Sequence, residues 1–155
     1  MSATDNTGQL TLVVLQIGNR RFALPSETVV ELAPPVRLHA FPHTSPLIAG
    51  VIVRRGRIVP VYDAASVLIG RSSSAQRFYL IARRRADSAS DLGAIPVNGE
   101  CQLASGHILA PESDRPAWIA GRVSLHNESI DVLDFGALAS AKPETTESNR
   151  AELSS

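Results

Sequence analysis

Few residues in this sequence of 155 amino acids have the types and spacing that catalysis or metal binding requires. His39 and His43 are four apart, as zinc ligands on a helix are, but Pro42 between them disfavours a helix. Cys101 is the single cysteine and has no basic neighbour in the sequence, so we expect a buried, inert thiol. The motifs of phosphate-binding loops, dinucleotide folds, serine hydrolases and zinc proteases are missing. The sequence therefore predicts no enzyme activity, no metal and no cofactor.

Two clusters of arginine carry the more unusual chemistry. Arg54, Arg55 and Arg57 surround Gly56 in a segment with the pattern of a tight turn, and nothing local in the sequence neutralises them. Such a cluster is either a solvated turn or a cationic contact for a partner protein. A second run, at 83–85, leads into a longer loop and is more typical of a solvated charge run.

The net charge is zero but unevenly placed. Residues 20–85 hold eleven arginines against three acidic residues, a balance of +8, whereas 86–155 hold four basic and eleven acidic residues. An asymmetry of this kind can indicate a nucleic-acid surface. The aromatic residues of the basic half fall mostly in apolar strand-like runs, which leaves few for stacking on bases. A nucleic-acid-binding β-barrel therefore stays an alternative, and we expect no nucleic-acid partner.

Short apolar runs rich in β-branched residues predict an all-β fold with short helices. Nine such runs lie at 12–17, 22–24, 29–32, 48–53, 58–62, 78–82, 92–97, 119–125 and 130–133. Turn residues join several of them, notably Gly18-Asn19, Arg55-Gly56 and His126-Asn127. Helical turns are predicted only at 26–29, 64–68 and 135–139.

An internal repeat with a constant offset of 71 residues is the most informative pattern. The segment 47–50 (Leu-Ile-Ala-Gly) matches 118–121 (Trp-Ile-Ala-Gly), and Asp63 matches Asp134. Each Asp precedes a helical turn, so paired N-caps explain them better than a catalytic carboxylate pair. Trp118 matches Leu47 and is predicted to lie in the core. We infer two β modules of one design, each a small closed barrel, because closure removes exposed strand edges.

The ends of the chain are polar and carry little apolar surface. We expect disorder at 1–9 and 141–155 and one domain over 10–140, with subdomains of about 10–75 and 76–140. Whether terminal strands exchange between the subdomains is left open. The N-terminal residues do not resemble a secretory signal, no apolar run reaches 18 residues, and the single cysteine excludes an internal disulfide. These features predict a cytoplasmic protein without membrane insertion.

The segment from Gly50 to Asp63, with its Arg55-Gly56 turn followed by Ile-Val-Pro60-Val, resembles the chemotaxis coupling protein CheW and CheW-like domains. The segments 22–25 (Phe-Ala-Leu-Pro) and 29–32 (Val-Val-Glu-Leu) agree, and the resemblance covers about residues 10–140. It implies two SH3-like β-barrel subdomains and an adaptor without catalysis. Its expected partners are the cytoplasmic hairpin tip of chemoreceptors and the regulatory domain of a CheA-type histidine kinase.

The resemblance also assigns expected roles to residues. It places Arg55 and Gly56 in a partner-binding turn, with Arg54 and Arg57 as cationic neighbours. Residues expected to determine the fold are Gly50, Pro60, Asp63, Gly121 and Asp134.

Two departures from the family pattern affect the expected partner more than the fold. Val53-Arg54 replaces a polar and an aliphatic residue before the Arg-Gly pair, and Asn98 replaces an acidic residue. The alternative is therefore an adaptor of a divergent chemosensory pathway, such as surface motility or biofilm signalling.

Overall fold

The computed structural model describes residues 9–40, 45–71, 78–85 and 87–141. Within these ranges the predicted strands and helical turns are all present, and one further strand, β8, was not predicted. The strands are β1 (Gln9–Ile17), β2 (Arg20–Pro25), β3 (Val29–Ala33), β4 (Ile48–Arg54), β5 (Arg57–Tyr62), β6 (Phe78–Arg83), β7 (Leu92–Val97), β8 (Gln102–Leu109), β9 (Ile119–Leu125) and β10 (Glu128–Leu133). The helical segments are η1 (Ser26–Thr28), α2 (Ala64–Leu68) and α3 (Phe135–Ala139). Disorder was expected at 1–9 and 141–155, but Gln9 lies in β1, and 1–8 and 142–155 lie outside the described residues.

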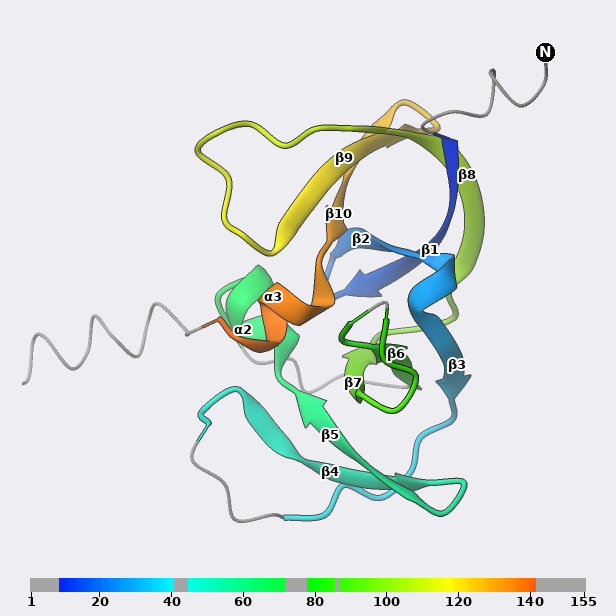
Figure 1. The fold of residues 1–155 in the computed structure, drawn as a ribbon, viewed down its shortest axis with the longest axis vertical. Helices are drawn as coiled ribbons and strands as arrows, with labels where there is room; N and C mark the ends of the chain where they lie inside the picture. The colour runs from blue at the N-terminus through cyan, green and yellow to red at the C-terminus, as the bar shows by residue number, and fades with distance from the viewer. Residues whose placement is uncertain (1–8, 41–44, 72–77, 86, 142–155) are drawn as a thin grey trace, which may run out of the picture.

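The strands form two sheets that exchange hairpins between the two halves of the chain (Figure 1). A closed barrel has the order β1-β2-β10-β9-β8, and a five-stranded sheet has the order β3-β6-β7-β5-β4. The β1–β2 hairpin of the first half thus joins three strands of the second, and the β6–β7 hairpin joins three strands of the first. The sheets therefore do not divide at residue 75, because both are built from both halves.

The 71-residue repeat holds down to individual hydrogen bonds. The bounds of β4, β5 and α2 are each 71 residues from those of β9, β10 and α3. The Asp63 amide donates to the Leu47 carbonyl at 2.7 Å, and the Asp134 amide donates to the Trp118 carbonyl at 2.8 Å. Both strand pairs are therefore followed by the same backbone anchor and the same helical turn.

The two repeated aspartates differ in capping. The Asp134 Oδ1 atom accepts from the Ala137 amide at 3.2 Å, as predicted for an N-cap. Asp63 occupies the N-cap position of α2, but its side chain makes no capping hydrogen bond, which corrects the prediction of paired caps. Ser66 stands where α3 has Ala137, and its hydroxyl donates to the Asp63 carbonyl at 2.8 Å. A serine side chain thus ties the first turn of α2 to its N-cap residue.

The two sheets also differ in how their two edges are joined to each other. In the barrel, β8 pairs with both β1 and β9 and completes the ring. The matching chain after β3 begins with Pro34 and Pro35, which have no amide hydrogen to donate to a ladder. His39 then makes a single bridge to Val51, with N···O distances of 2.8 and 2.9 Å. One of the two predicted closed barrels is thus closed by a full strand, and the other sheet is joined end to end by one bridge.

Gly50 and Gly121 occupy matching positions of the repeat. At each of them another segment of the chain passes close to the backbone of the hairpin. A Cβ atom at Gly50 would lie 2.5 Å from the His39 carbonyl oxygen, and one at Gly121 would lie 2.6 Å from the Leu109 carbonyl oxygen. Real Cβ atoms do not approach this closely, so a side chain at either position would force the neighbouring backbone to shift. Both therefore serve the fold in this structure.

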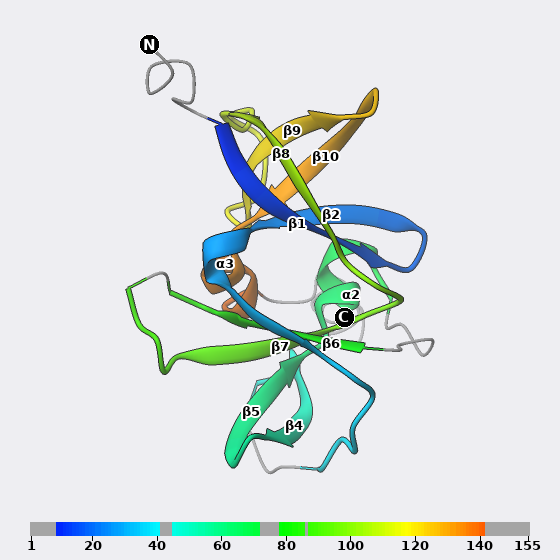
Figure 2. The same cartoon turned by 90° about the vertical axis from the view of Figure 1, so that its right-hand side faces the viewer.

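The described residues form three apolar cores. One fills the barrel (among others Val123 and Ile130) and one fills the five-stranded sheet (among others Ile52 and Val59). The largest lies between the sheets, where α2 and α3 also pack (Figure 2). Trp118 packs against this third core while remaining partly exposed.

Polar contacts also connect the two sheets at the β1–β2 turn. The Gly18 amide donates to the Asn98 Oδ1 atom at 3.2 Å, and the Asn98 Nδ2 atom donates to the Gly18 carbonyl at 3.1 Å. An amide side chain can both accept and donate in this way, whereas an ionised carboxylate cannot donate. Arg20 adds a hydrogen bond from Nη1 to the Leu68 carbonyl at the end of α2, at 3.0 Å. Asn98 can therefore make both hydrogen bonds to Gly18, whereas an ionised acidic residue at this position could only accept one.

Candidate partner-binding site

The Arg55-Gly56 turn joins β4 to β5 with two successive residues in the left-handed region. Arg55 has φ of 54° and Gly56 has φ of 77°, and Arg54 pairs directly with Arg57 across the hairpin. Two positive φ values in a two-residue loop match the right-handed twist of the strands. A Cβ atom at Gly56 would meet nothing within 4 Å, so only the backbone conformation favours glycine there. The predicted turn is thus present.

Glu31 on β3 holds two of the three arginines, which sequence proximity could not reveal. Its Oε2 atom accepts from Arg54 Nε at 2.9 Å, and its Oε1 atom accepts from Arg55 Nε at 3.1 Å. Burial raises the pKa of the Glu31 carboxyl, but the hydrogen bonds and charges of both arginines outweigh burial and hold it below its ordinary value. The turn is therefore fixed to the opposite edge of the sheet.

The remaining surface of the turn combines positive charge with apolar side chains. The Arg55 side chain is 72% exposed although it is paired, and Arg57 is exposed. Next to the turn, Val53 and Ile58 are direct cross-strand partners, and they are 52% and 67% exposed. Large apolar side chains so exposed beside a rigid cationic turn are typical of a protein-binding surface.

The matching β9–β10 turn in the second half provides an internal comparison. His126 and Asn127 also have positive φ, 50° and 66°, so the two turns share a backbone conformation. The cross-strand pair beside this turn is Ser124 and Ser129, where the first hairpin has Val53 and Ile58. The shared backbone conformation therefore does not require apolar side chains beside the turn, and the exposed Val53 and Ile58 pair is particular to the first hairpin.

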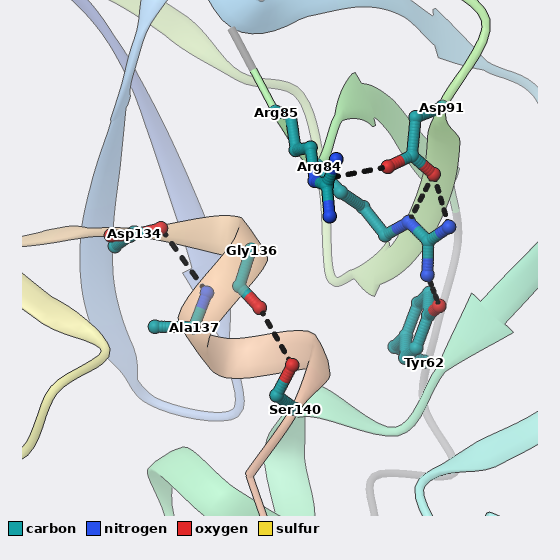
Figure 3. A network of polar contacts seen from close by, with 8 residues as sticks. All are labelled: Tyr62, Arg84, Arg85, Asp91, Asp134, Gly136, Ala137 and Ser140. Atoms are coloured by element: carbon teal, nitrogen blue, oxygen red, sulfur yellow. Dashed lines mark hydrogen bonds and ion pairs between the residues drawn. The ribbon is translucent and has the colours of Figure 1, made fainter. Parts of the chain in front are cut away.

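The other basic run, 83–85, is only partly solvated, which corrects its prediction. Arg84 Nε donates to Asp91 Oδ1 at 2.7 Å, and its terminal nitrogens contact Asp91 and the Tyr62 hydroxyl (Figure 3). A Cβ atom at Gly136 would lie 2.6 Å from the Arg84 carbonyl oxygen, so α3 packs directly on this loop. Arg84 thus connects the loop, β5 and α3, while Arg85 stays exposed.

Burial keeps two further polar groups in their neutral forms. Cys101 is only partly buried and not fully buried as predicted, yet this burial raises the pKa of its thiol. Burial also raises the pKa of Tyr62, although the charge of Arg84 opposes this effect.

The structure describes only one of the two histidines that are four residues apart in the sequence. His39 forms the bridge to β4, and His43 lies outside the described residues. Over the described ranges, no group of three His, Cys, Asp or Glu side chains could hold a metal ion. None of the helices within these ranges is long and apolar enough to cross a membrane.

The described part of the chain is thus a β-structure whose β4–β5 turn exposes both charged and large apolar side chains. The structure is similar to the crystal structure of the scaffolding protein TtCheW from Thermoanaerobacter tengcongensis, with a TM-score of 0.72. That alignment covers 83% of this chain and 86% of the other at 18% identity, which shows a shared fold. The model of the CheW-like domain family matches residues 11–143, so the chain belongs to the CheW-like domain family. No curated protein matches the sequence.

Proposed function

We propose that this protein is a non-enzymatic chemotaxis adaptor that couples methyl-accepting chemoreceptors to a CheA-type histidine kinase in cytoplasmic signalling arrays. Membership of a scaffold family supports this role, and the sequence shows no motif of an enzyme active site. The observation that carries the proposal is the β4–β5 turn, where exposed Arg55 stands beside the exposed Val53 and Ile58 pair.

The chemistry of this turn defines what its partner must present. Val53 and Ile58 need an apolar surface, and Arg55 and Arg57 need acceptors such as carboxylates at its rim. Because Glu31 already orients Arg55, less side-chain freedom is lost when a partner binds. We assign the regulatory domain of the kinase to this turn and the receptor hairpin tip to a separate surface of the adaptor.

An adaptor of a divergent chemosensory pathway would use the same turn with a different kinase, which would agree with the unusual number of arginines beside the turn.

Nucleic-acid binding gains no support from the described residues. Phe22, Tyr62 and Tyr79 are buried and cannot stack on bases. Part of the positive charge is also paired, by Glu31 and by Asp91.

The test is calorimetric titration of the full chain with the kinase regulatory domain from its own source, at two salt concentrations. Arg55→Ala should weaken binding by at least about 1 kcal/mol while the thermal midpoint stays within a few degrees. His126→Ala, at the matching position of the other turn, is the control and should bind like the wild type.

Three results would count against the assignment. Equal loss of affinity in both variants would place the contact elsewhere, and an unfolded Arg55→Ala variant would make Arg55 structural. Absence of binding to both the kinase domain and a receptor tip peptide at micromolar concentrations would overturn the adaptor role.

A further inference from the structure

A second cationic cluster surrounds a single carboxylate on the outside of the closed barrel. Asp131 on β10 forms ion pairs with Arg20, Arg115 and Arg122, at N···O distances of 3.8, 3.8 and 3.9 Å. These distances are too long for hydrogen bonds. The Asp131 side chain is only 12% exposed, so one sheltered negative charge is shared among three guanidinium groups. The cluster retains excess positive charge and unused N–H donors.

Two of the three arginines also line a pocket. Arg20 also donates to the Leu68 carbonyl, whereas Arg115 and Arg122 line a pocket of about 150 Å³ beside the 110–118 loop. Its apolar wall is formed by Leu109, Pro111 and Ile119. A cavity of about this volume can hold a benzene-sized group, so one apolar side chain fits.

Glu112 is the one acidic residue lining the pocket, and it does not neutralise the two arginines. In the described part of the chain, no ion pair joins the Glu112 carboxylate to Arg115 or Arg122. Its connection to Arg115 is through the backbone, where the Arg115 amide donates to the Glu112 carbonyl at 3.0 Å. The guanidinium groups therefore remain available to an incoming anion.

The matching described positions of the first half do not carry this charge cluster. The repeat aligns Arg122 with Val51 and Asp131 with Pro60, a cross-strand pair in each case. The cluster is therefore an addition to the β9–β10 hairpin that the shared fold does not require.

We propose that this pocket is a docking site for an acidic segment of a partner protein, in which a carboxylate binds between Arg115 and Arg122 and a neighbouring apolar side chain packs against Leu109. Guanidinium groups match the planar shape of a carboxylate, and each added hydrogen bond to an ionised acceptor is charge-assisted. A polypeptide satisfies the arginines and the apolar wall together, whereas an isolated anion would leave the wall exposed. The site is independent of the Arg55-Gly56 turn.

The test is a nuclear magnetic resonance titration of the full 15N-labelled chain with two synthetic peptides. The probe is acetyl-Gly-Leu-Glu-Leu-Gly-amide, and its matched control has Gln in place of Glu. The Glu peptide should saturate at millimolar concentrations and shift the Nε–Hε signals of Arg115 and Arg122 together with the Gly121 amide. The Gln peptide should bind about tenfold more weakly, because it lacks the charge-assisted hydrogen bonds.

Variants connect the signal to the pocket. Arg115→Gln and Arg122→Gln should each weaken binding of the Glu peptide about tenfold, and Arg115 lies in a loop where its replacement leaves the strands intact. Arg21→Gln is the control on the same barrel, since Arg21 pairs with Glu128 at 3.5 Å. Arg55→Ala should bind the peptide like the wild type, which separates this site from the proposed kinase contact.

Three outcomes would overturn the proposal. Equal affinity for the two peptides would show that no carboxylate is recognised, and equal affinity for inorganic phosphate would indicate a general anion patch. An increase in affinity on removal of residues 142–155 would make the C-terminal segment of this chain the occupant.

Discussion

The β4–β5 and β9–β10 hairpins have the same turn conformation and the same following helix, yet they present different surfaces. Their inward residues correspond closely, for example Ile52 with Val123 and Val59 with Ile130, and all four are buried. Outward positions differ in character, with Val53 and Ile58 in one hairpin and serines in the other. The difference teaches that burial constrains the repeat on one face, whereas the solvent face is free to acquire a separate contact in each copy.

The largest expected effect tests whether the two crossings are equally rigid. Gly121→Ala should destabilise the fold by about 3 kcal/mol, because the new methyl group meets the Leu109 carbonyl at the end of β8, a strand held by pairing with both β1 and β9. Gly50→Ala should cost about 1 kcal/mol, because the chain above it is held by the His39 bridge and can move away. Urea unfolding of both variants measures the difference. Equal losses would show that the single bridge is as rigid as the strand.

A smaller effect separates backbone conformation from side-chain contact at the turn. Gly56→Val should destabilise by about 2 kcal/mol, since a β-branched residue resists positive φ and no neighbour lies close enough to clash. Gly56→Asn should stay within about 0.5 kcal/mol of the wild type, because the matching Asn127 adopts the same conformation. Thermal unfolding distinguishes them. Equal destabilisation by Asn and Val would contradict a purely conformational role.

Exchanging surface residues between the hairpins tests the contact surface itself. Val53→Ser together with Ile58→Ser should leave the free energy of unfolding nearly unchanged and weaken binding of the kinase domain by about 1–2 kcal/mol. The reciprocal change, Ser124→Val with Ser129→Ile, should not alter that affinity. Calorimetry on both double variants decides the matter, and unchanged affinity in the first would remove the apolar flank from the interface.

The smallest effect concerns Glu31, which the repeat aligns with Gln102. Because the pKa of Glu31 is lowered in the folded protein, its ion pairs stabilise the fold above the ordinary value of 4.5 and are lost as the pH falls through the folded-state pKa. Glu31→Gln should therefore cost less than about 1 kcal/mol at neutral pH, and the difference from the wild type should shrink on acidification. Urea unfolding at several pH values provides the measurement. A difference that grows below pH 4.5 would contradict the assigned pairing.

Local patterns predicted the strands that bury apolar residues, and the repeat predicted that the two hairpins correspond. β8 escaped prediction because its sequence, from Gln102 to Leu109, contains Ser105, Gly106 and His107 and has no fully buried residue. Closure of the barrel supplies its stability through pairing with β1 and β9, which is not visible in a local apolar pattern.

The candidate site was predictable only in its local part. The Arg55-Gly56 turn follows from residue type, because glycine relieves positive φ. The role of Glu31 depends on strands that meet only in the folded sheet, and no spacing rule relates Glu31 to Arg54. Asp91, by contrast, pairs with Arg84 only seven residues away, across the loop of the β6–β7 hairpin. The exchange of hairpins was similarly hidden, because the same local pairings suit two separate modules.

The exchanged hairpins have a consequence for synthesis of the chain on the ribosome. The β1–β2 hairpin is made first, but its neighbours β8 and β10 are completed only about 85 and 110 residues later. At about 5–20 residues per second, its apolar face stays without its final partners for several seconds. A nascent chain of this design thus remains open to chaperones, and to pairing with another copy, until its last strand has been made.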